Sequence, residues 1–243
     1  MEKQHEVEIV EQVFTILDKE NLTDEMVDEA FGLLGKVFDE DCLEQIQKGV
    51  EAGLTSEQVA VYAKCEFDYV QMEAIRLGLE NRLSMEQVSV YAKPEFTWYQ
   101  MPQILFGFQA GLSMEQVSMY AKPELTGEQM EEIRWGFEHG LSIEQVEVYA
   151  KPELSAAQMS EIRLGLENRL SMEQVSLYAR QEFAFGQMRQ IRWGFEAGLS
   201  MEEVSALIKK PSLAEKIMTA KKEQGQAVNK GPEKSRGNEE LAK

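Results

Sequence analysis

Hydrophobic residues recur in this chain at two spacings, a short one typical of helices and a long one typical of a repeat. Val88, Tyr91 and Ala92 follow the i, i+3, i+4 pattern of one buried helical stripe. A longer stripe follows them, made of Met101, Ile104, Leu105 and Phe108. The short spacing therefore predicts two helices, a first over about residues 85–93 and a second over about residues 98–109.

The long spacing is 29 residues and is held without insertion or deletion. It is marked by Leu54, Leu83, Leu112, Leu141, Leu170 and Leu199. Copies that differ at the two ends are expected of caps. The sequence predicts four parts: an N-terminal cap with a divergent repeat (1–52), five repeats (53–197), a degenerate C-terminal cap repeat (198–223) and a disordered basic tail (224–243).

Each copy contains two signals for the start of a helix. Ser84 with Gln87, and Thr97 with Gln100, have the spacing of capping boxes, in which side chains and amides bond reciprocally. The second helix ends at a left-handed residue, for which Gly111, Gly140 and Gly198 are suited. Two copies carry Arg82 and Arg169 there, and we expect the preceding residues, Asn81 and Asn168, to take the role.

A glycine stands in the middle of every second helix, where it costs about 1 kcal/mol relative to alanine unless it permits a close approach. These positions are Gly78, Gly107, Gly136, Gly165 and Gly194. We expect the backbones of two helices to cross there. Helices this short need their neighbours for stability. The predicted fold is all-α, a right-handed-type α-α solenoid of about six 29-residue helix-turn-helix repeats with capping helices at both ends.

The repeated sequence resembles a known group of repeats. It reads Val-x-x-Tyr-Ala-Lys-Pro-Glu-Phe/Leu, as at residues 88–96, and then Gln-Met-x-x-Ile-Arg-x-Gly-Phe/Leu-Glu, as at residues 129–138. This resembles uncharacterised short two-helix repeats in proteins of conjugative and other mobile elements of gut bacteria, over residues 53–197. The resemblance implies a mobile-element setting and no particular chemistry.

The net charge of −18 is unevenly distributed. Residues 209–243 hold nine Lys or Arg and five Glu, whereas residues 1–208 hold 16 Lys or Arg and 38 Asp or Glu, a net charge of −22. Direct binding of nucleic acid by the acidic body is disfavoured, because phosphate contacts depend on Lys and Arg. A polar N-terminus and the lack of a long apolar run predict a cytoplasmic protein with no membrane contact.

No residue set predicts catalysis, a metal site or a cofactor. The histidines are His5, near the N-terminus, and His139, at the end of a predicted helix. Cys42 and Cys65 lack metal-ligand spacing, and we expect both to be reduced and to fill the core. We therefore expect a noncatalytic protein, and an enzyme is the less favoured alternative.

A binding surface is predicted where the copies differ most, in the three residues before each Gln-Met pair. The candidate contact residues are Tyr69, Trp98, Tyr99, Glu128 and Phe185. Pro102, inside the second helix, should remove a backbone hydrogen bond beside two of them. We expect a scaffold that binds another protein through this edge. The alternative is that the aromatics pack into the neighbouring layer, as we expect for Trp135 and Trp193.

A recurring arginine in the second helix supports a different hypothesis. The series is Arg76, Arg134, Arg163 and Arg192, with Leu105 interrupting it. It could form a basic stripe for an anionic polymer, but pairing with the Glu ladders is favoured because the body is acidic. The alternative function is a nucleic-acid-related accessory of a mobile element, acting through the basic tail or as an acidic mimic of nucleic acid.

Overall fold

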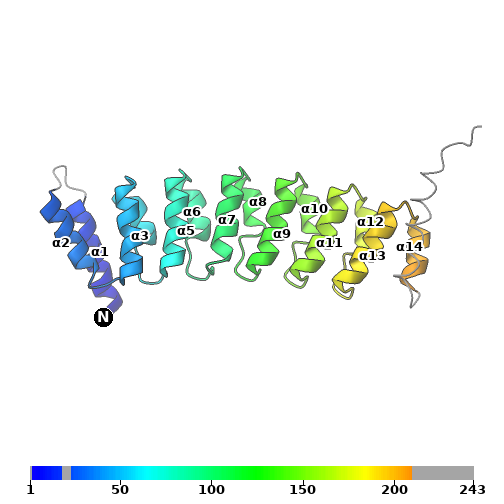
Figure 1. The fold of residues 1–243 in the computed structure, drawn as a ribbon, viewed down its shortest axis with the longest axis horizontal. Helices are drawn as coiled ribbons and strands as arrows, with labels where there is room; N and C mark the ends of the chain where they lie inside the picture. The colour runs from blue at the N-terminus through cyan, green and yellow to red at the C-terminus, as the bar shows by residue number, and fades with distance from the viewer. Residues whose placement is uncertain (1, 18–22, 210–243) are drawn as a thin grey trace, which may run out of the picture. The chain divides into compact units, whose positions relative to one another are not determined.

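The computed structural model describes residues 2–17 and 23–209, and this part of the chain is all-α (Figure 1). It contains fourteen helices and no strand. The helices are α1 (Glu2–Leu17), α2 (Asp24–Leu34), α3 (Glu40–Glu51), α4 (Ser56–Tyr62), α5 (Tyr69–Glu80), α6 (Met85–Tyr91), α7 (Gln100–Gln109), α8 (Met114–Ser118), α9 (Gly127–Glu138), α10 (Ile143–Glu147), α11 (Ala156–Glu167), α12 (Met172–Tyr178), α13 (Phe185–Glu196) and α14 (Met201–Ile208). The end of the predicted C-terminal cap repeat, from residue 210, and the predicted basic tail lie outside the described residues.

The helices form two compact units, one with α1 to α9 and most of α10, the other with α11 to α14. In the first unit the long helices α3, α5, α7 and α9 pack against one another in chain order and stand in one row in Figure 1. The short helices α4 and α6 each contact the long helix before and the long helix after. In the second unit α11 packs against α13, and α12 contacts both.

The predicted capping boxes define the helix starts. Ser84 Oγ accepts a hydrogen bond from the Gln87 amide at 3.1 Å, and the Ser84 amide donates to Gln87 Oε1 at 2.9 Å. The short helix ends earlier than predicted, at Tyr91 rather than near Lys93. Ala92 has ψ 65°, and the Lys93 amide donates to the Tyr91 carbonyl at 2.7 Å, so a tight turn replaces the last helical residues.

The mid-helix glycines do not mark a crossing of two helix backbones, so that prediction was wrong. A Cβ on Gly78 would overlap the hydroxyl of Tyr91, which is buried and donates to the Ala74 carbonyl at 3.4 Å. The same pairing occurs at Gly49 with Tyr62, Gly107 with Tyr120, and Gly165 with Tyr178. Glycine is thus needed to seat a tyrosine hydroxyl against the long helix.

Two other sequence predictions are corrected. Arg82 and Arg169 themselves adopt the left-handed conformation, with φ of 63° and 65°, while Asn81 stays at φ −79°. The backbone closes the helix there in the same way as at a glycine, because the Leu83 amide donates to the Gly78 carbonyl at 3.0 Å. Cys42 is buried as predicted, but Cys65 is exposed, because it lies in the turn where other copies have Pro94.

Candidate functional site

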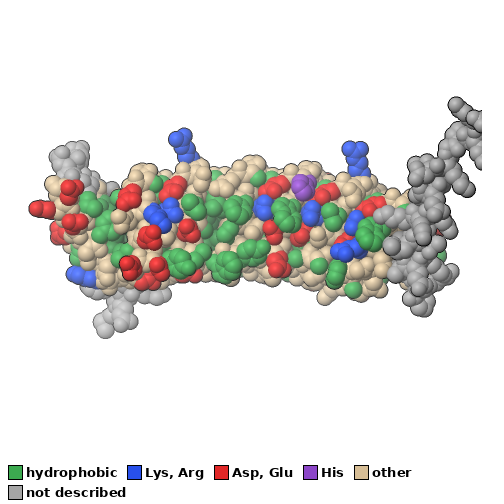
Figure 2. Space-filling view, viewed as in Figure 1, with side chains coloured by type: hydrophobic (Ala, Val, Ile, Leu, Met, Phe, Trp, Pro, Cys, Tyr) green, Lys and Arg blue, Asp and Glu red, His purple; other side chains and the backbone are tan. Residues whose placement is uncertain are grey.

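The outward side of the long helices in the first unit carries the candidate site. On α7, Pro102 and Phe106 are the non-buried positions of its first two turns, and they lie on one stripe because they are four residues apart. Equivalent stripes on α5 and α9 hold Leu77 and Trp135. Figure 2 shows hydrophobic side chains gathered over α5 and α7 on this side. We define the α7 face as Tyr69, Leu77, Trp98, Tyr99, Pro102 and Phe106.

Pro102 determines how the α7 face begins. The helix was expected to start at Trp98, but it starts at Gln100. A proline ring clashes with the carbonyl four residues earlier, which here belongs to Trp98, so Trp98 and Tyr99 form a turn instead of a first helical turn. Tyr99 occupies the N-cap position, and its side chain makes no capping hydrogen bond to the start of the helix. The predicted box is only half formed, because the Thr97 amide donates to Gln100 Oε1 at 2.8 Å without the reverse contact from a capping side chain.

Trp98 and Tyr99 have different surroundings. Trp98 is 63% exposed, the highest value among the exposed large hydrophobic residues described. The Tyr99 ring lies against Gly127, where a Cβ would overlap it, and its hydroxyl donates to Glu131 Oε2 at 3.3 Å. The Glu131 carboxylate raises the pKa of Tyr99, because ionising the phenol beside it would place two negative charges together. Tyr99 therefore packs into the next layer, as the alternative predicted, and Trp98 does not.

Phe106 belongs to the face, although the sequence reasoning did not select it. It is 45% exposed, and the guanidinium carbon of Arg134 lies 5.7 Å from its ring centroid. Trp135 and Trp193, expected in the inter-layer core, are only half-buried. The spacing from Pro102 is the signal that could have identified Phe106, since residues four apart on a helix share a face.

The other predicted contact residues are divided between the two units. Tyr69, at the start of α5, is 47% exposed, and Glu128, at the start of α9, is exposed. Phe185 opens α13 in the second unit, where it is 47% exposed with the Arg189 guanidinium 5.5 Å from its ring centroid. The structure therefore brings Trp98 and Tyr99 together on the α7 face, with Tyr69 on the neighbouring helix.

The proposed basic stripe does not present its charges to solvent. Arg76 is 7% exposed; its Nη1 donates to Glu80 Oε1 at 2.5 Å, and its Nε donates to Gln45 Oε1 at 3.2 Å. Arg134 and Arg192 repeat the pattern, with an acid four residues later and an acceptor 31 residues earlier. Arg163 is buried too and pairs with Glu167 at 2.6 Å. The guanidinium groups of Arg76, Arg134 and Arg192 join adjacent layers, which favours the structural interpretation over anion binding.

The arginine series is interrupted in a coordinated way at α7. Leu105 replaces the arginine, Ala74 stands at the acceptor position 31 residues earlier, and Gln109 replaces the acid four residues later. Leu105 and Ala74 are buried, so an apolar pair replaces the polar network between α5 and α7. As a result α7 has no charged residue along its whole length.

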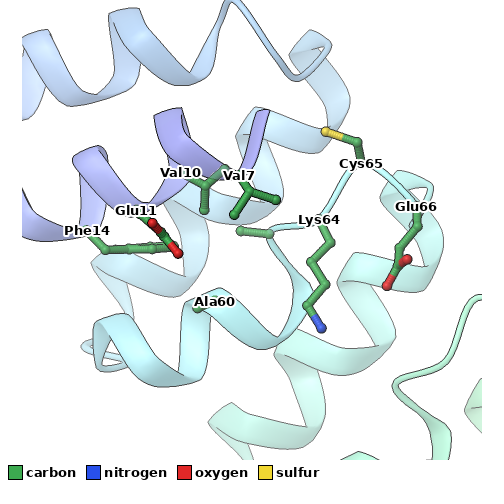
Figure 3. A pocket seen from close by; sticks show the side chains of 9 residues that line it. Val7, Val10, Glu11, Phe14, Ala60, Lys64, Cys65 and Glu66 are labelled. Carbon is green, nitrogen blue, oxygen red and sulfur yellow. The ribbon is translucent and has the colours of Figure 1, made fainter. Parts of the chain in front are cut away.

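A separate cavity of about 470 Å³ lies between α1 and the turn that follows α4. Its apolar wall is formed by Val7, Val10, Phe14, Ala60 and Ala63. Figure 3 shows the two valines extending from α1 toward the turn that carries Lys64, Cys65 and Glu66. Its volume falls in the range of small-molecule sites, but its charged lining groups, Glu11 on α1 and Lys64 and Glu66 in the turn, are all solvent-exposed.

Chemistry-bearing groups are spread over the described residues. His139 is exposed at the C-terminal end of α9, and His5 lies in the part of α1 whose side chains are not described. Among the residues with described side chains, no three His, Cys, Asp or Glu gather as metal ligands would. In residues 2–17 and 23–209, no helix is both long and apolar enough to cross a membrane.

Comparison with known proteins gives no match. No family model matches the chain, and no curated protein or solved structure shows significant similarity to it. Function is therefore argued from the α7 face and its surroundings.

Proposed function

We propose that this chain is a noncatalytic helical-repeat scaffold that binds another protein through the α7 face. The observation that carries the proposal is the exposure of Trp98 on a turn imposed by Pro102, beside the exposed Phe106. Aromatic residues contribute strongly to protein interfaces, and leaving them in water has a cost that a partner would remove.

The scaffold we propose is a right-handed α-α solenoid. Its support is the recurrence of equivalent contacts, since α3 packs on α5, α5 on α7 and α7 on α9 in one unit, and α11 packs on α13 in the other. In such a protein each repeat contacts only its neighbours, so the outward residues are released from core packing and are available for binding. The resemblance to mobile-element repeats suggests the biological setting of the partner.

The test is affinity capture from native lysate with the full chain and with a Trp98→Ala/Phe106→Ala variant. We expect the variant to lose the captured protein, because both substitutions remove exposed aromatic area and leave the core intact. Met85→Ala is the matched control, since Met85 is also an exposed large hydrophobic side chain but belongs to the short helix α6. Capture that is unchanged in the double variant and survives nuclease would show that the partner binds elsewhere.

The alternative is an acidic mimic of nucleic acid or a nucleic-acid accessory acting through the basic tail. It is supported by the net charge of −22 over residues 1–208 together with the burial of the recurring arginines, which leaves the acids dominant at the surface. Capture that is lost with nuclease, or on truncation after Lys209, would favour this alternative over the scaffold.

A further inference from the structure

The α7 face combines an uncharged centre with acidic flanks. Helix α7 carries no Asp, Glu, Lys or Arg, whereas α5 carries Glu73 and Glu80 and α9 carries Glu128, Glu131 and Glu138. Figure 2 shows acidic side chains on both sides of the hydrophobic cluster over α5 and α7. The outward surface thus has an apolar row between two rows in which acids alternate with apolar residues.

The cations near this surface do not balance the acids. The side chains of Arg76 and Arg134 are 8% and 10% exposed, and each is already engaged by acids of its own helix. The acids that engage them are Glu73, Glu80, Glu131 and Glu138, but the Glu73 side chain is still 45% exposed, and Glu128 is exposed as well. Residues 53–152 hold fifteen Asp or Glu and seven Lys or Arg, so the repeats that carry the apolar row have a net charge of −8, which favours a basic partner.

We propose that the α7 face binds an amphipathic helix of the partner protein, with an apolar stripe flanked on both sides by Lys or Arg. This proposal rests on the proposed function and specifies the partner of the same surface. A helix lying along α7 would place its apolar stripe on Phe106 and Trp98, and its basic rows over the acids of α5 and α9. Two helices that pack this way approach within about 8–10 Å, which is within reach of Lys and Arg side chains.

Charge excludes the other classes of occupant from this proposal. A second copy of the chain would oppose acidic flanks to acidic flanks, and like charges across an interface are unfavourable. Phosphate groups of a nucleic acid or of an anionic membrane would meet the same repulsion. A basic segment is attracted instead, and its apolar stripe covers the exposed aromatics.

The test uses the full chain and a fluorescent 18-residue helical peptide with a leucine stripe flanked by lysines. Anisotropy is measured at low and physiological salt. We expect Trp98→Ala/Phe106→Ala to weaken peptide binding about tenfold, since two interface aromatics are lost. We expect the charge variant Glu73→Gln/Glu128→Gln/Glu131→Gln to weaken peptide binding about fivefold at low salt, since partly exposed charge pairs contribute modestly. The loss should be smaller at physiological salt, because salt screens the charges.

The matched control changes the net charge equally but in another place. It is Glu153→Gln/Glu173→Gln/Glu202→Gln, in which all three acids are exposed and belong to the second unit. Equal weakening by the two triple variants, or equal binding of a peptide with glutamates in place of the lysines, would overturn the proposal. Thermal unfolding of every variant verifies that the fold is retained.

Three further outcomes separate this inference from the proposed function. If lysate capture depends on Trp98 and Phe106 but the peptide does not bind, the proposed scaffold function is supported and the proposal of a basic partner helix is overturned. If sedimentation shows that the wild type dimerises and Trp98→Ala/Phe106→Ala is a monomer, the occupant is a second copy and the inference is overturned. If the peptide binds as expected but capture is independent of these residues, the inference holds and the captured protein uses another surface.

Discussion

At the scale of single residues, the most constrained contact is the one between the mid-helix glycine and the tyrosine of the following short helix. The Tyr91 hydroxyl lies where a side chain on Gly78 would begin, and it also donates to the Ala74 carbonyl. The ring fills the core while its oxygen is still satisfied, so the pair joins a short helix to a long one with no unpaired buried polar group.

Gly78→Ala should therefore destabilise the fold by roughly 2–3 kcal/mol, because the new methyl group must displace a buried ring. The measurement is chemical unfolding followed by circular dichroism. Gly32→Ala is the control, since Gly32 lies in the last turn of α2 with open space around it, and it should gain up to about 1 kcal/mol from helix propensity. Tyr91→Phe in the Gly78→Ala background should recover part of the loss. Additive effects of the two changes would contradict the contact.

Arg82 offers a prediction of the opposite sign. Its φ of 63° is unfavourable for a residue with a side chain, so Arg82→Gly should stabilise the protein by up to about 1 kcal/mol. Asn81→Gly should instead be destabilising, because Asn81 has a negative φ and its Nδ2 donates to the Leu77 carbonyl at 2.7 Å. The unfolding midpoints of the two variants test these expectations. A higher midpoint for Asn81→Gly than for Arg82→Gly would contradict the assignment of Arg82 as the left-handed residue that ends the helix.

At the scale of secondary-structure elements, α7 differs from its counterparts through Pro102. The equivalent helices α5 and α9 begin two positions earlier in the repeat, at Tyr69 and Gly127. Because α7 begins later, Trp98 lies in a turn and not in a first helical turn. The equivalent aromatics Tyr69 and Phe185 are exposed at ordinary helix starts, so Pro102 determines the backbone that carries Trp98 rather than its exposure.

Pro102→Ala should extend α7 to Trp98, since the clash with the Trp98 carbonyl is removed and an amide becomes available to bond it. We expect helical Cα chemical shifts at Trp98 and Tyr99 by NMR, with weaker partner binding because the indole is redirected. Pro123→Ala is the control: Pro123 lies in a turn between helices and should leave α7 unchanged. Unchanged shifts at Trp98 would show that the turn does not depend on Pro102.

The sequence was sufficient to predict two helices in each repeat, because their caps and apolar stripes are local signals, but it placed the end of the short helix too late and the start of α7 too early. It also selected Trp98, whose exposure follows from its place before a helix. It could not separate Trp98 from Tyr99, since the difference depends on Gly127 in the next repeat, 28 residues after Tyr99. The role of Gly78 was wrongly predicted, and the role of Arg76 was left open, for the same reason. Each depends on a partner 13 or 31 residues away, and helical periodicity within one element does not report such contacts.

At the scale of the whole molecule, the buried tyrosines give the fold a common response to alkaline pH. Burial raises the pKa of Tyr62, Tyr91, Tyr120 and Tyr178. The unfolded chain releases these protons near the ordinary pKa of about 10, before the folded chain does, so the folded state is disfavoured above that pH. The contribution is fully present below pH 10 and decreases as pH rises beyond it.

We therefore expect the free energy of unfolding to be nearly independent of tyrosine ionisation at neutral pH and to fall steeply above about pH 10. Urea unfolding at pH 8 and at pH 11 measures the difference, with absorbance at 295 nm reporting phenolate. Replacing Tyr91 by phenylalanine should reduce the slope, because one titrating group is removed. A slope that is unaffected would mean that other groups control alkaline unfolding.

Three buried arginines, Arg76, Arg134 and Arg192, find an acceptor 31 residues earlier, and this register limits how the chain can gain or lose copies. Removing residues 111–139 would place Gln103 opposite Arg163, a pairing of the kind already present between Gln103 and Arg134. Removing residues 82–110 would place Ala74 opposite Arg134 and leave a buried guanidinium short of an acceptor. We therefore expect a chain that has lost residues 111–139 to keep its buried pairing and a chain that has lost residues 82–110 to be destabilised. A shortened chain that folds stably is thus expected to keep the copy that bears Trp98.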